Sequence, residues 1–495
     1  MLQNINRREF LKTTSMASGA VLMAVCGSWA LSNRRQKPNL VFVFADQWRA
    51  QDTGYAGNSD VLTPNLDKLE KESVNFKNAV SCCPVCSPFR ASLMTGQYPL
   101  THGLLINDLQ LSTRAVSFAH ALAGAGYDTA YIGKWHLDGS GRSDYIPPER
   151  RQGFDYWKVL ECTHNYNHSE YYAGSSDKVR AWDGYDAYAQ TDDAEKYITS
   201  RSGSGKPFAL FLSWGPPHNP YRTGPKMWLD YYSSRDIKMR PNVSPQDYGK
   251  AKKDITGYYA HCSALDRCVG QLLSAIRGNG IADNTIFVFT ADHGDMLYSH
   301  RQVRKQKPWE ESVRIPFLVK CPDSWQVRPR QSGEMINSPD IMPTMLSLCG
   351  VDIPDTAQGT DYSGVIFGGK SNIENSALIM CPSPFGEWHP ARGGVAYRGV
   401  RTKRYTYVRK LDGPWLLYDN LDDPYQMNNL CGKTEYLDIQ QKLEKELEYW
   451  LKKTGDDFAS GPELLKRCGY RVDKKLTVPF DNPDYHGQVS KPAAI

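Results

Sequence analysis

Residues that can bind ions or transfer protons follow four apolar runs of the chain. In chain order these polar segments are Asp46-Gln47, Lys134-Trp135-His136, His218 and Asp292-His293. Carboxylate and amide oxygens suit hard cations such as Ca²⁺ or Mg²⁺, and an imidazole transfers protons near neutral pH. In an open α/β sheet, ligands gather at the carboxyl ends of the strands. The pattern therefore indicates a ligand site that these segments share.

A cysteine and an arginine stand at a fixed spacing in a fifth segment, which reads CSPFRASLMTGQYP from Cys86 to Pro99. Arg90 lies one helical turn after Cys86, so its guanidinium can hold a nearby anion with paired hydrogen bonds. The segment matches the sulfatase signature: Cys, Pro two residues later, Arg four residues later, then Leu, Thr-Gly and Pro. From about Pro38 to Val319, and more weakly beyond, the sequence resembles the formylglycine-dependent type I sulfatases of the alkaline-phosphatase-like superfamily.

The resemblance implies that a maturation enzyme oxidises Cys86 to the aldehyde formylglycine. Its hydrate would attack sulfur with one hydroxyl, giving a covalent sulfoester, and would expel sulfate through the other, which divides one hard step into two. Cys82 and Cys83 lack the spacing to Pro and Arg and are expected to remain thiols. A plain metallophosphatase that uses an unmodified Cys86 is the alternative for this segment alone.

The resemblance also implies a metal site at Asp46, Gln47, Asp292 and His293, with Cys86 beside them. Gln47 is an amide where family members carry a second acid. We expect one Ca²⁺ ion, with Mg²⁺ or Mn²⁺ as less favoured alternatives and Zn²⁺ still open because one ligand is an imidazole. A cation here would polarise a sulfate oxygen.

Four further residues are assigned roles by the resemblance. Lys134 and Lys305 correspond to the sulfate-binding lysines of the family, and Lys307 fits that pattern less well. His136 corresponds to the base that takes a proton from the hydrated aldehyde as sulfate leaves. His218 corresponds to the general acid that protonates the departing oxygen.

Residues that face the substrate are predicted from polar and aromatic loops. We expect a sugar pocket, because the 12 Trp and 29 Tyr residues suit carbohydrate binding. Loops that pack on their own aromatic residues are the alternative interpretation. The candidate pocket residues are His102, Asn107, Asp108, His164, His168, His389 and Arg392.

Buried strands and helices must position these segments. The continuous apolar runs at 40–45, 127–132, 207–213 and 285–290 predict parallel strands covered on both faces, and helices are expected over 63–72, 115–124 and 258–276. Residues 395–420 alternate as antiparallel strands do, and residues 439–453 predict an amphipathic helix. The fold class is therefore α/β. The resemblance implies the alkaline-phosphatase-like fold, with a mostly parallel sheet between helices in residues 32–375 and a smaller α+β subdomain with a small antiparallel sheet in residues 376–495.

Residues 1–31 have the order of an export signal. Arg7-Arg8, followed by Phe10-Leu11-Lys12, resembles a twin-arginine signal and precedes a short apolar stretch. The sequence predicts export to the bacterial periplasm or the extracellular space. A lipid on Cys26 and an uncleaved membrane anchor are the alternatives.

The overall composition argues against two other classes of protein. A net charge of +5 over 495 residues gives no concentrated basic face, so no nucleic-acid partner is expected. Among the 12 cysteines, no CxxC pair is followed by a second one, which disfavours a structural zinc site and favours buried thiols.

The sequence predicts hydrolysis of a sulfate ester, in which R–O–SO₃⁻ and water give R–OH and sulfate, with a sulfated carbohydrate as substrate. A phosphonate or phosphate diester hydrolase of the same superfamily is the nearest alternative. A catalytically inactive glycan-binding protein is disfavoured, because the nucleophile, metal pairs, lysines and histidines occur together.

Overall fold

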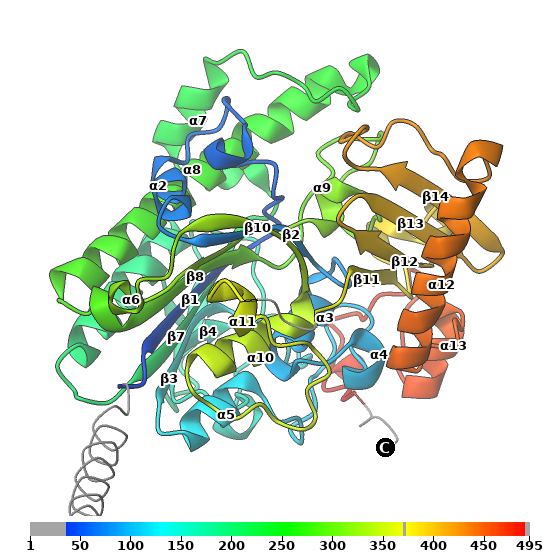
Figure 1. Ribbon diagram of the computed structural model, residues 1–495. Helices are drawn as coiled ribbons and strands as arrows, with labels where there is room; N and C mark the ends of the chain where they lie inside the picture. Colours follow the sequence, from blue (N-terminus) through cyan, green and yellow to red (C-terminus); the bar gives the residue numbers. More distant parts are fainter. Residues whose placement is uncertain (1–35, 370–372, 491–495) are drawn as a thin grey trace, which may run out of the picture. The chain divides into compact units, whose positions relative to one another are not determined.

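A mixed ten-stranded sheet forms the centre of the fold (Figure 1). The computed structural model describes residues 36–369 and 373–490, so the predicted export signal and Cys26 lie outside the described residues. The strands β8, β1, β7, β3 and β4 form a continuous parallel run. Across the sheet the order is β10 (Arg330–Asn337), β2 (Val74–Val80), β9 (Phe317–Lys320), β8 (Thr285–Ala291), β1 (Asn39–Asp46), β7 (Phe208–Pro217), β3 (Asp128–Lys134), β4 (Tyr156–Leu160), β5 (Glu170–Ala173) and β6 (Arg180–Ala181).

Helices form two groups that cover the faces of this sheet (Figure 1). The first group consists of α8 (Tyr248–Gly278), which contacts α2 (Pro64–Glu70), α6 (Asp186–Arg201) and α7 (Lys226–Ser233). In the second, α3 (Cys86–Thr95), α5 (Phe118–Gly124) and α10 (Ser338–Leu348) contact one another. The short helices are α4 (Pro99–His102), α9 (Glu310–Val313) and α11 (Ser363–Ile366). None of the helices in the described ranges combines the length and apolarity that a lipid bilayer crossing needs.

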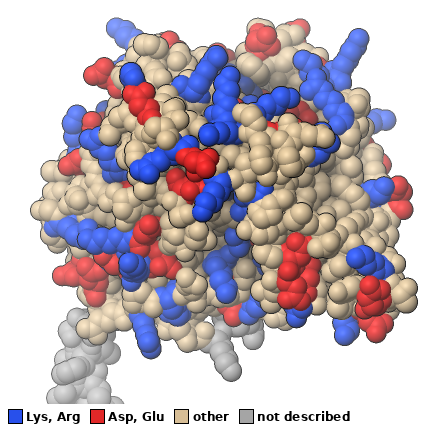
Figure 2. All heavy atoms as spheres, turned by 90° about the horizontal axis from the view of Figure 1, so that it is seen from above, with Lys and Arg blue, Asp and Glu red and all other residues tan. Residues whose placement is uncertain are grey.

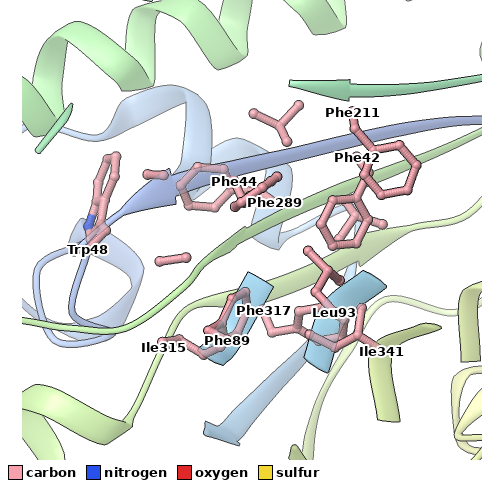
Figure 3. Packing of buried hydrophobic residues seen from close by; sticks show 14 of the residues in the cluster. Phe42, Phe44, Trp48, Phe89, Leu93, Phe211, Phe289, Ile315, Phe317 and Ile341 are labelled. Atoms are coloured by element: carbon pink, nitrogen blue, oxygen red, sulfur yellow. The ribbon is translucent and has the colours of Figure 1, made fainter. Parts of the chain in front are cut away.

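The core explains why the central strands read as unbroken apolar runs. Every residue of β1 is buried, and Phe42 and Phe44 lie beside Phe211 of β7 and Phe289 of β8 (Figure 3). Phe42 and Phe211 stack with ring centroids 5.2 Å apart. A strand with neighbours on both edges and helices on both faces has no exposed side, which removes the polar alternation of a surface strand. The predicted strands β1, β3, β7 and β8 are confirmed.

The register of these strands brings their carboxyl ends to one edge of the sheet. Ala45 of β1 pairs with Trp214 of β7 and Ala291 of β8. Asp46, His218 and Asp292 follow at or just beyond these positions. The sequence expectation that the polar segments share an edge is therefore correct.

A second, antiparallel sheet lies in the C-terminal part of the chain, with the order β11-β12-β13-β14. Its strands are β11 (Ser376–Cys381), β12 (Tyr397–Thr402), β13 (Tyr405–Lys410) and β14 (Gly413–Asp419). Helix α12 (Leu437–Thr454) packs on β11, β12 and β13, and α13 (Gly461–Cys468) follows it (Figure 1). The alternation at 395–420 corresponds to β12–β14, and β11 was not predicted, because its apolar sequence SALIMC carries no period-two signal.

One sequence expectation needs adjustment. The helix expected over 258–276 begins at Tyr248, because Ala251 and Ile255 extend its buried stripe through a charged segment.

On the face seen in Figure 2, basic side chains are interspersed with acidic ones. An anionic substrate must therefore be held by a local group of cations and not by the net charge of the surface.

Candidate active site

Cys86 is the first residue of α3, at the edge of the sheet where the strands end. Phe89 and Leu93 of the same helix pack into the core beneath the central strands (Figure 3), which fixes the helix axis. The N-terminus of α3 therefore presents its partial positive charge at Cys86 and favours an anion there. The side chain of Cys86 itself is buried.

Four candidate ligand groups surround one point next to Cys86. The ligand atoms of Asp46, Cys86, Asp292 and His293 all lie within 4.8 Å of one another. The Cys86 Sγ atom is 3.3 Å from His293 Nε2 and 3.6 Å from Asp46 Oδ1. His293 Nδ1 lies 3.0 Å from the Gly294 carbonyl and donates its proton there. The Nε2 atom of the neutral ring is therefore unprotonated, and its lone pair is available to a metal.

Gln47 adjoins the cluster, because its backbone amide donates to Asp292 Oδ1 at 2.9 Å. Its Nε2 donates to Asp295 Oδ2 at 2.7 Å, whereas its buried Oε1 has no hydrogen-bond partner among the described residues. An unpaired buried oxygen is costly, and a cation would compensate it. The carboxylates and the imidazole of the cluster, with the unpaired amide oxygen of the adjoining Gln47, therefore fit a divalent cation.

Arg90 connects the two carboxylates of this cluster. Its Nη2 lies 3.3 Å from both Asp46 Oδ2 and Asp292 Oδ2, and its Nη1 donates to Ser213 Oγ at 2.7 Å. The guanidinium also lies 5.0 Å from the centre of the Phe44 ring. Arg90 thus holds the carboxylates apart from one another and in place.

Both predicted sulfate-binding lysines reach Cys86. Lys305 Nζ is 2.9 Å from Cys86 Sγ, and Lys134 Nζ is 3.8 Å from it and 2.6 Å from Asp46 Oδ2. Lys307 is directed elsewhere, because its Nζ donates to the Val303 carbonyl at 2.8 Å. Lys305 thus contacts Cys86, whereas Lys307, which fits the family pattern less well, is bonded to Val303.

The two histidines sit on different parts of the site. His218 Nδ1 lies 2.8 Å from the Asn219 carbonyl, and its Nε2 accepts from Lys305 Nζ at 3.0 Å. The His164 ring stacks on it with centroids 4.7 Å apart. His136 Nε2 instead lies 3.1 Å from Asp108 Oδ1. The Arg142 guanidinium holds both oxygens of this Asp108 carboxylate through bonds of 2.9 Å each.

The backbone at this site is strained. Gln47, Asp108 and His136 adopt φ values of 72°, 63° and 60°, a region that L-residues with side chains visit rarely. Such conformations persist only where the surroundings enforce them, and they concentrate at functional sites. Here they turn the three side chains toward the cluster, Asp295 or one another.

Opposite charges and burial shift the pKa values of the site in opposite directions. Burial raises the pKa of Asp46, but Lys134 and the neighbouring cations outweigh it and hold that pKa well below its ordinary value. Burial, assisted by Asp46, raises the pKa of the Cys86 thiol to about 12, so an unmodified Cys86 is a neutral thiol at pH 7. Burial and the adjacent Lys305 lower the pKa of His218.

A cavity of about 280 Å³ opens onto the cluster. Of the predicted substrate residues, Asn107, Asp108 and His164 line it. The described residues that line this cavity do not include the other four predicted ones, which are His102, His168, His389 and Arg392. His102 is buried with its ring on Ser92 and the Leu104 amide, His168 and Arg392 are exposed, and His389 caps a short 3₁₀ helix.

Several cavity residues were missed at the sequence level. Arg142, Arg304 and Phe480 come from loops without a motif, and only tertiary packing brings them together. Cys162 also lines the cavity; burial raises the pKa of its thiol, but Lys134 and other cations outweigh this and lower it well below its ordinary value. The aromatic and polar stretch around Cys162 was the one available signal for it.

Comparison with known proteins identifies the family of this chain. The model of the sulfatase family matches residues 38–351, and that of the C-terminal part of N-sulphoglucosamine sulphohydrolase matches residues 299–453. An ulvan-active sulfatase of Formosa agariphila is 42% identical over 93% of this chain and 90% of its own length. An endo-4-O-sulfatase of Bacteroides thetaiotaomicron is 30% identical over 91% of this chain and 100% of its own.

A solved Bacteroides thetaiotaomicron structure from work on glycosaminoglycan metabolism superimposes with a TM-score of 0.78 at 29% identity, over 87% of this chain and 99% of that one. The alkaline-phosphatase-like α/β fold is therefore confirmed. The family implies a metal ion and a formylglycine, and the buried cluster around Cys86 is a suitable place for both. The chain belongs to the sulfatase family and is a hydrolase of sulfate esters.

Proposed function

We propose that this sulfatase removes sulfate from a carbohydrate, with formylglycine made from Cys86 as nucleophile and one Ca²⁺ ion beside it. The observation that carries the proposal is the ring of groups around Cys86 Sγ. Lys305 lies at 2.9 Å, His293 at 3.3 Å, Asp46 at 3.6 Å and Lys134 at 3.8 Å. Two ammonium groups, a carboxylate and an imidazole are thus within reach of one atom.

Asp46, Gln47, Asp292 and His293 would hold the cation, and Cys86 lies beside it. Oxygen donors dominate this set, which favours Ca²⁺ over softer metals. When bound, the cation and the aldehyde supply Lewis acidity and a nucleophilic hydroxyl. Arg90 keeps the two carboxylates in position through its bonds to both.

The remaining residues handle the anion and the protons. Lys134 and Lys305 approach Cys86 and would bind oxygens of the sulfate group. His218 would donate a proton to the departing oxygen from Nε2, which lies 3.0 Å from Lys305 Nζ and thus close to the sulfate-binding groups. His136, oriented by Asp108, would accept the proton released from the nucleophile.

A sulfated carbohydrate is the substrate class that we favour. The related proteins are described as an ulvan-active sulfatase and an endo-4-O-sulfatase. The cavity adds hydrogen-bonding groups from Asn107, Asn219 and Glu387 to an aromatic wall, which suits a sugar ring.

We further propose that residues 1–31 direct export before cleavage, and that residues 32–375 carry catalysis while residues 376–495 form a subdomain that completes the cavity. Lys305, from the larger part, and Phe385 and Glu387, from the smaller one, line the same cavity, which supports a shared site.

Three measurements on the purified protein test this function. Mass spectrometry of the peptide that contains Cys86 should show a mass below that of the thiol form, and 4-nitrophenyl sulfate should be hydrolysed far faster than an aryl phosphodiester. Chelation should abolish turnover, and Ca²⁺ should restore it. An active protein whose Cys86 retains its sulfur, or one that prefers the phosphodiester, would contradict the proposal.

A further inference from the structure

The chain after α13 contributes to the active-site cavity although it lies outside both matched family regions. Those regions end at residues 351 and 453. Thr477, Val478 and Phe480 nevertheless line the same cavity as Cys86 and His136. Residues 477–480, which contain these three, therefore form a wall of the cavity that lies outside both matched regions.

Backbone bonds fix this wall on both sides. Before it, the Gly386 amide donates to the Lys475 carbonyl at 3.1 Å, and a turn closes between Asp473 and Thr477 at 2.9 Å. After it, the Gly487 amide donates to the Gly139 carbonyl at 2.8 Å. The chain then runs alongside Gln110, whose amide donates to the Gln488 carbonyl at 3.0 Å. The wall is thus held in place independently of the side chain of Phe480.

Phe480 is the exposed member of the wall. Its side chain is 38% exposed, whereas Val478 is only 2% exposed. One face of the Phe480 ring is covered by the Arg142 guanidinium at 3.8 Å, and His486 Nε2 lies 2.9 Å from the Phe480 carbonyl. Arg142 is itself locked by its two bonds to Asp108. A rigid aromatic ring therefore faces the cavity with one side still open to solvent.

We propose that Phe480 stacks on the apolar face of a pyranose ring of the substrate, so that residues 477–480 form one wall of a sugar subsite. This inference rests on the proposed carbohydrate sulfatase function. A pyranose presents C–H groups on its faces and hydroxyls around its edge. The cavity offers the same division, with the ring of Phe480 for the face and the polar groups of Asn107, Thr477 and Glu387 for the edge.

Because the ring of Phe480 is preorganised by Arg142, its contact with a sugar costs little conformational entropy. A small aryl sulfate has no sugar to place there and gains less from the contact. Phe480 is thus expected to determine substrate preference, while the sulfate itself is held at Cys86.

The test compares kcat/KM for 4-nitrophenyl sulfate with that for the best saccharide among ulvan oligosaccharides, chondroitin 4-sulfate oligosaccharides and N-acetylglucosamine 6-sulfate. Phe480→Ala should lower kcat/KM for the saccharide about tenfold more than for the aryl sulfate, mainly through KM. Phe480→Tyr should recover most of the loss, because the ring is kept. Phe367→Ala is the control, because Phe367 is 53% exposed and lies outside the cavity lining. It should leave kcat/KM unchanged for both substrates.

The inference fails if Phe480→Ala lowers turnover of both substrates equally, since a displaced Arg142 and Asp108 would then explain the loss. It also fails if the saccharide preference is unchanged. A wild-type protein that hydrolyses the aryl sulfate but no saccharide would overturn the carbohydrate assignment and this inference together. A wild-type protein that releases sulfate from neither would instead contradict the proposed function itself.

Discussion

Asp295→Asn should weaken Ca²⁺ binding, although Asp295 is not proposed as a metal ligand. Asp295 Oδ1 accepts from the Leu297 amide at 3.0 Å and the Arg304 amide at 2.9 Å, while Oδ2 accepts from Gln47 Nε2 at 2.7 Å. The carboxylate therefore accepts at both oxygens. Through the second oxygen it fixes which end of the Gln47 amide carries the donor, so that Oε1 is the end left without a partner and available to a metal.

The amide of the substituted residue has one oxygen, so it cannot accept from both the backbone amides and Gln47 Nε2 as the carboxylate does. If its one remaining oxygen keeps the two backbone donors, its NH₂ group opposes Gln47 Nε2 at the distance of a hydrogen bond. Gln47 must then turn its amide, which places an NH₂ group where the cation needs an oxygen. Removal of a partner that orients a metal ligand costs about 10- to 100-fold in affinity, or about 1.4–2.8 kcal/mol.

Isothermal titration of Ca²⁺ into chelator-treated protein measures this effect without dependence on turnover. Tyr221→Phe is the matched control, because the Tyr221 hydroxyl contacts the same Asp295 oxygen but leaves the orientation of Gln47 unchanged. We expect the Ca²⁺ affinity of that control to lie within about threefold of the wild type, a smaller change than the one expected for Asp295→Asn. If Asp295→Asn is folded and binds Ca²⁺ as tightly as the wild type, Gln47 is not held for the metal in this way.

Three further perturbations test other parts of the site and the fold. His218→Ala should reduce kcat/KM for sugar sulfates by about 10²–10⁴, and that for 4-nitrophenyl sulfate much less, because only a sugar oxygen needs a proton to leave; equal losses would exclude His218 as the acid. Burial lowers the pKa of Lys307 to about 8, so the unfolded chain binds more protons between pH 8 and the ordinary lysine value of about 10.4, and folding stability rises with pH across that window. Lys307→Met should remove this rise in the free energy of unfolding, which is worth up to about 3 kcal/mol and is measured by urea unfolding at the two ends of the pH window. An unchanged pH dependence in the variant would contradict the lowered pKa of Lys307. Arg398→Met leaves the carboxylate of Asp456 buried and unpaired and should lower the free energy of unfolding by about 3–5 kcal/mol, whereas Arg404→Met at a more exposed pair should cost less than about 1 kcal/mol. Equal losses for the two arginine variants in urea unfolding would show that burial of the first pair has no such consequence.

The central strands were predictable from local patterns, whereas the membership of the site was implied by the resemblance. Residues 40–45 read as a continuous apolar run because β1 has neighbours on both edges and helices on both faces, and the other three runs follow the same rule. The approach of Lys305 and His218 to Cys86 was implied by the resemblance and not by spacing, since 219 residues separate Lys305 from Cys86. The role of Gln47 as an amide was the weak point, and its orientation depends on Asp295, which no pattern singled out.

The outer part of the site depends on contacts that leave no local trace. Arg142 joins Asp108, 34 residues earlier, and Phe480, far along the chain, and neither pairing has a periodicity or a motif. The same is true of the parallel contact between Gln110 and Val489, which brings the end of the described chain beside the segment that follows α4. The residues nearest the reacting sulfur are fixed by chemistry that all sulfate esters share, so a short signature can record them. The residues that distinguish one sugar from another need only surround the cavity, and many loop sequences can do so. Substrate preference is therefore expected to reside in residues such as Phe480 and Arg142, and changes there should alter the choice of saccharide before they alter the chemistry at Cys86.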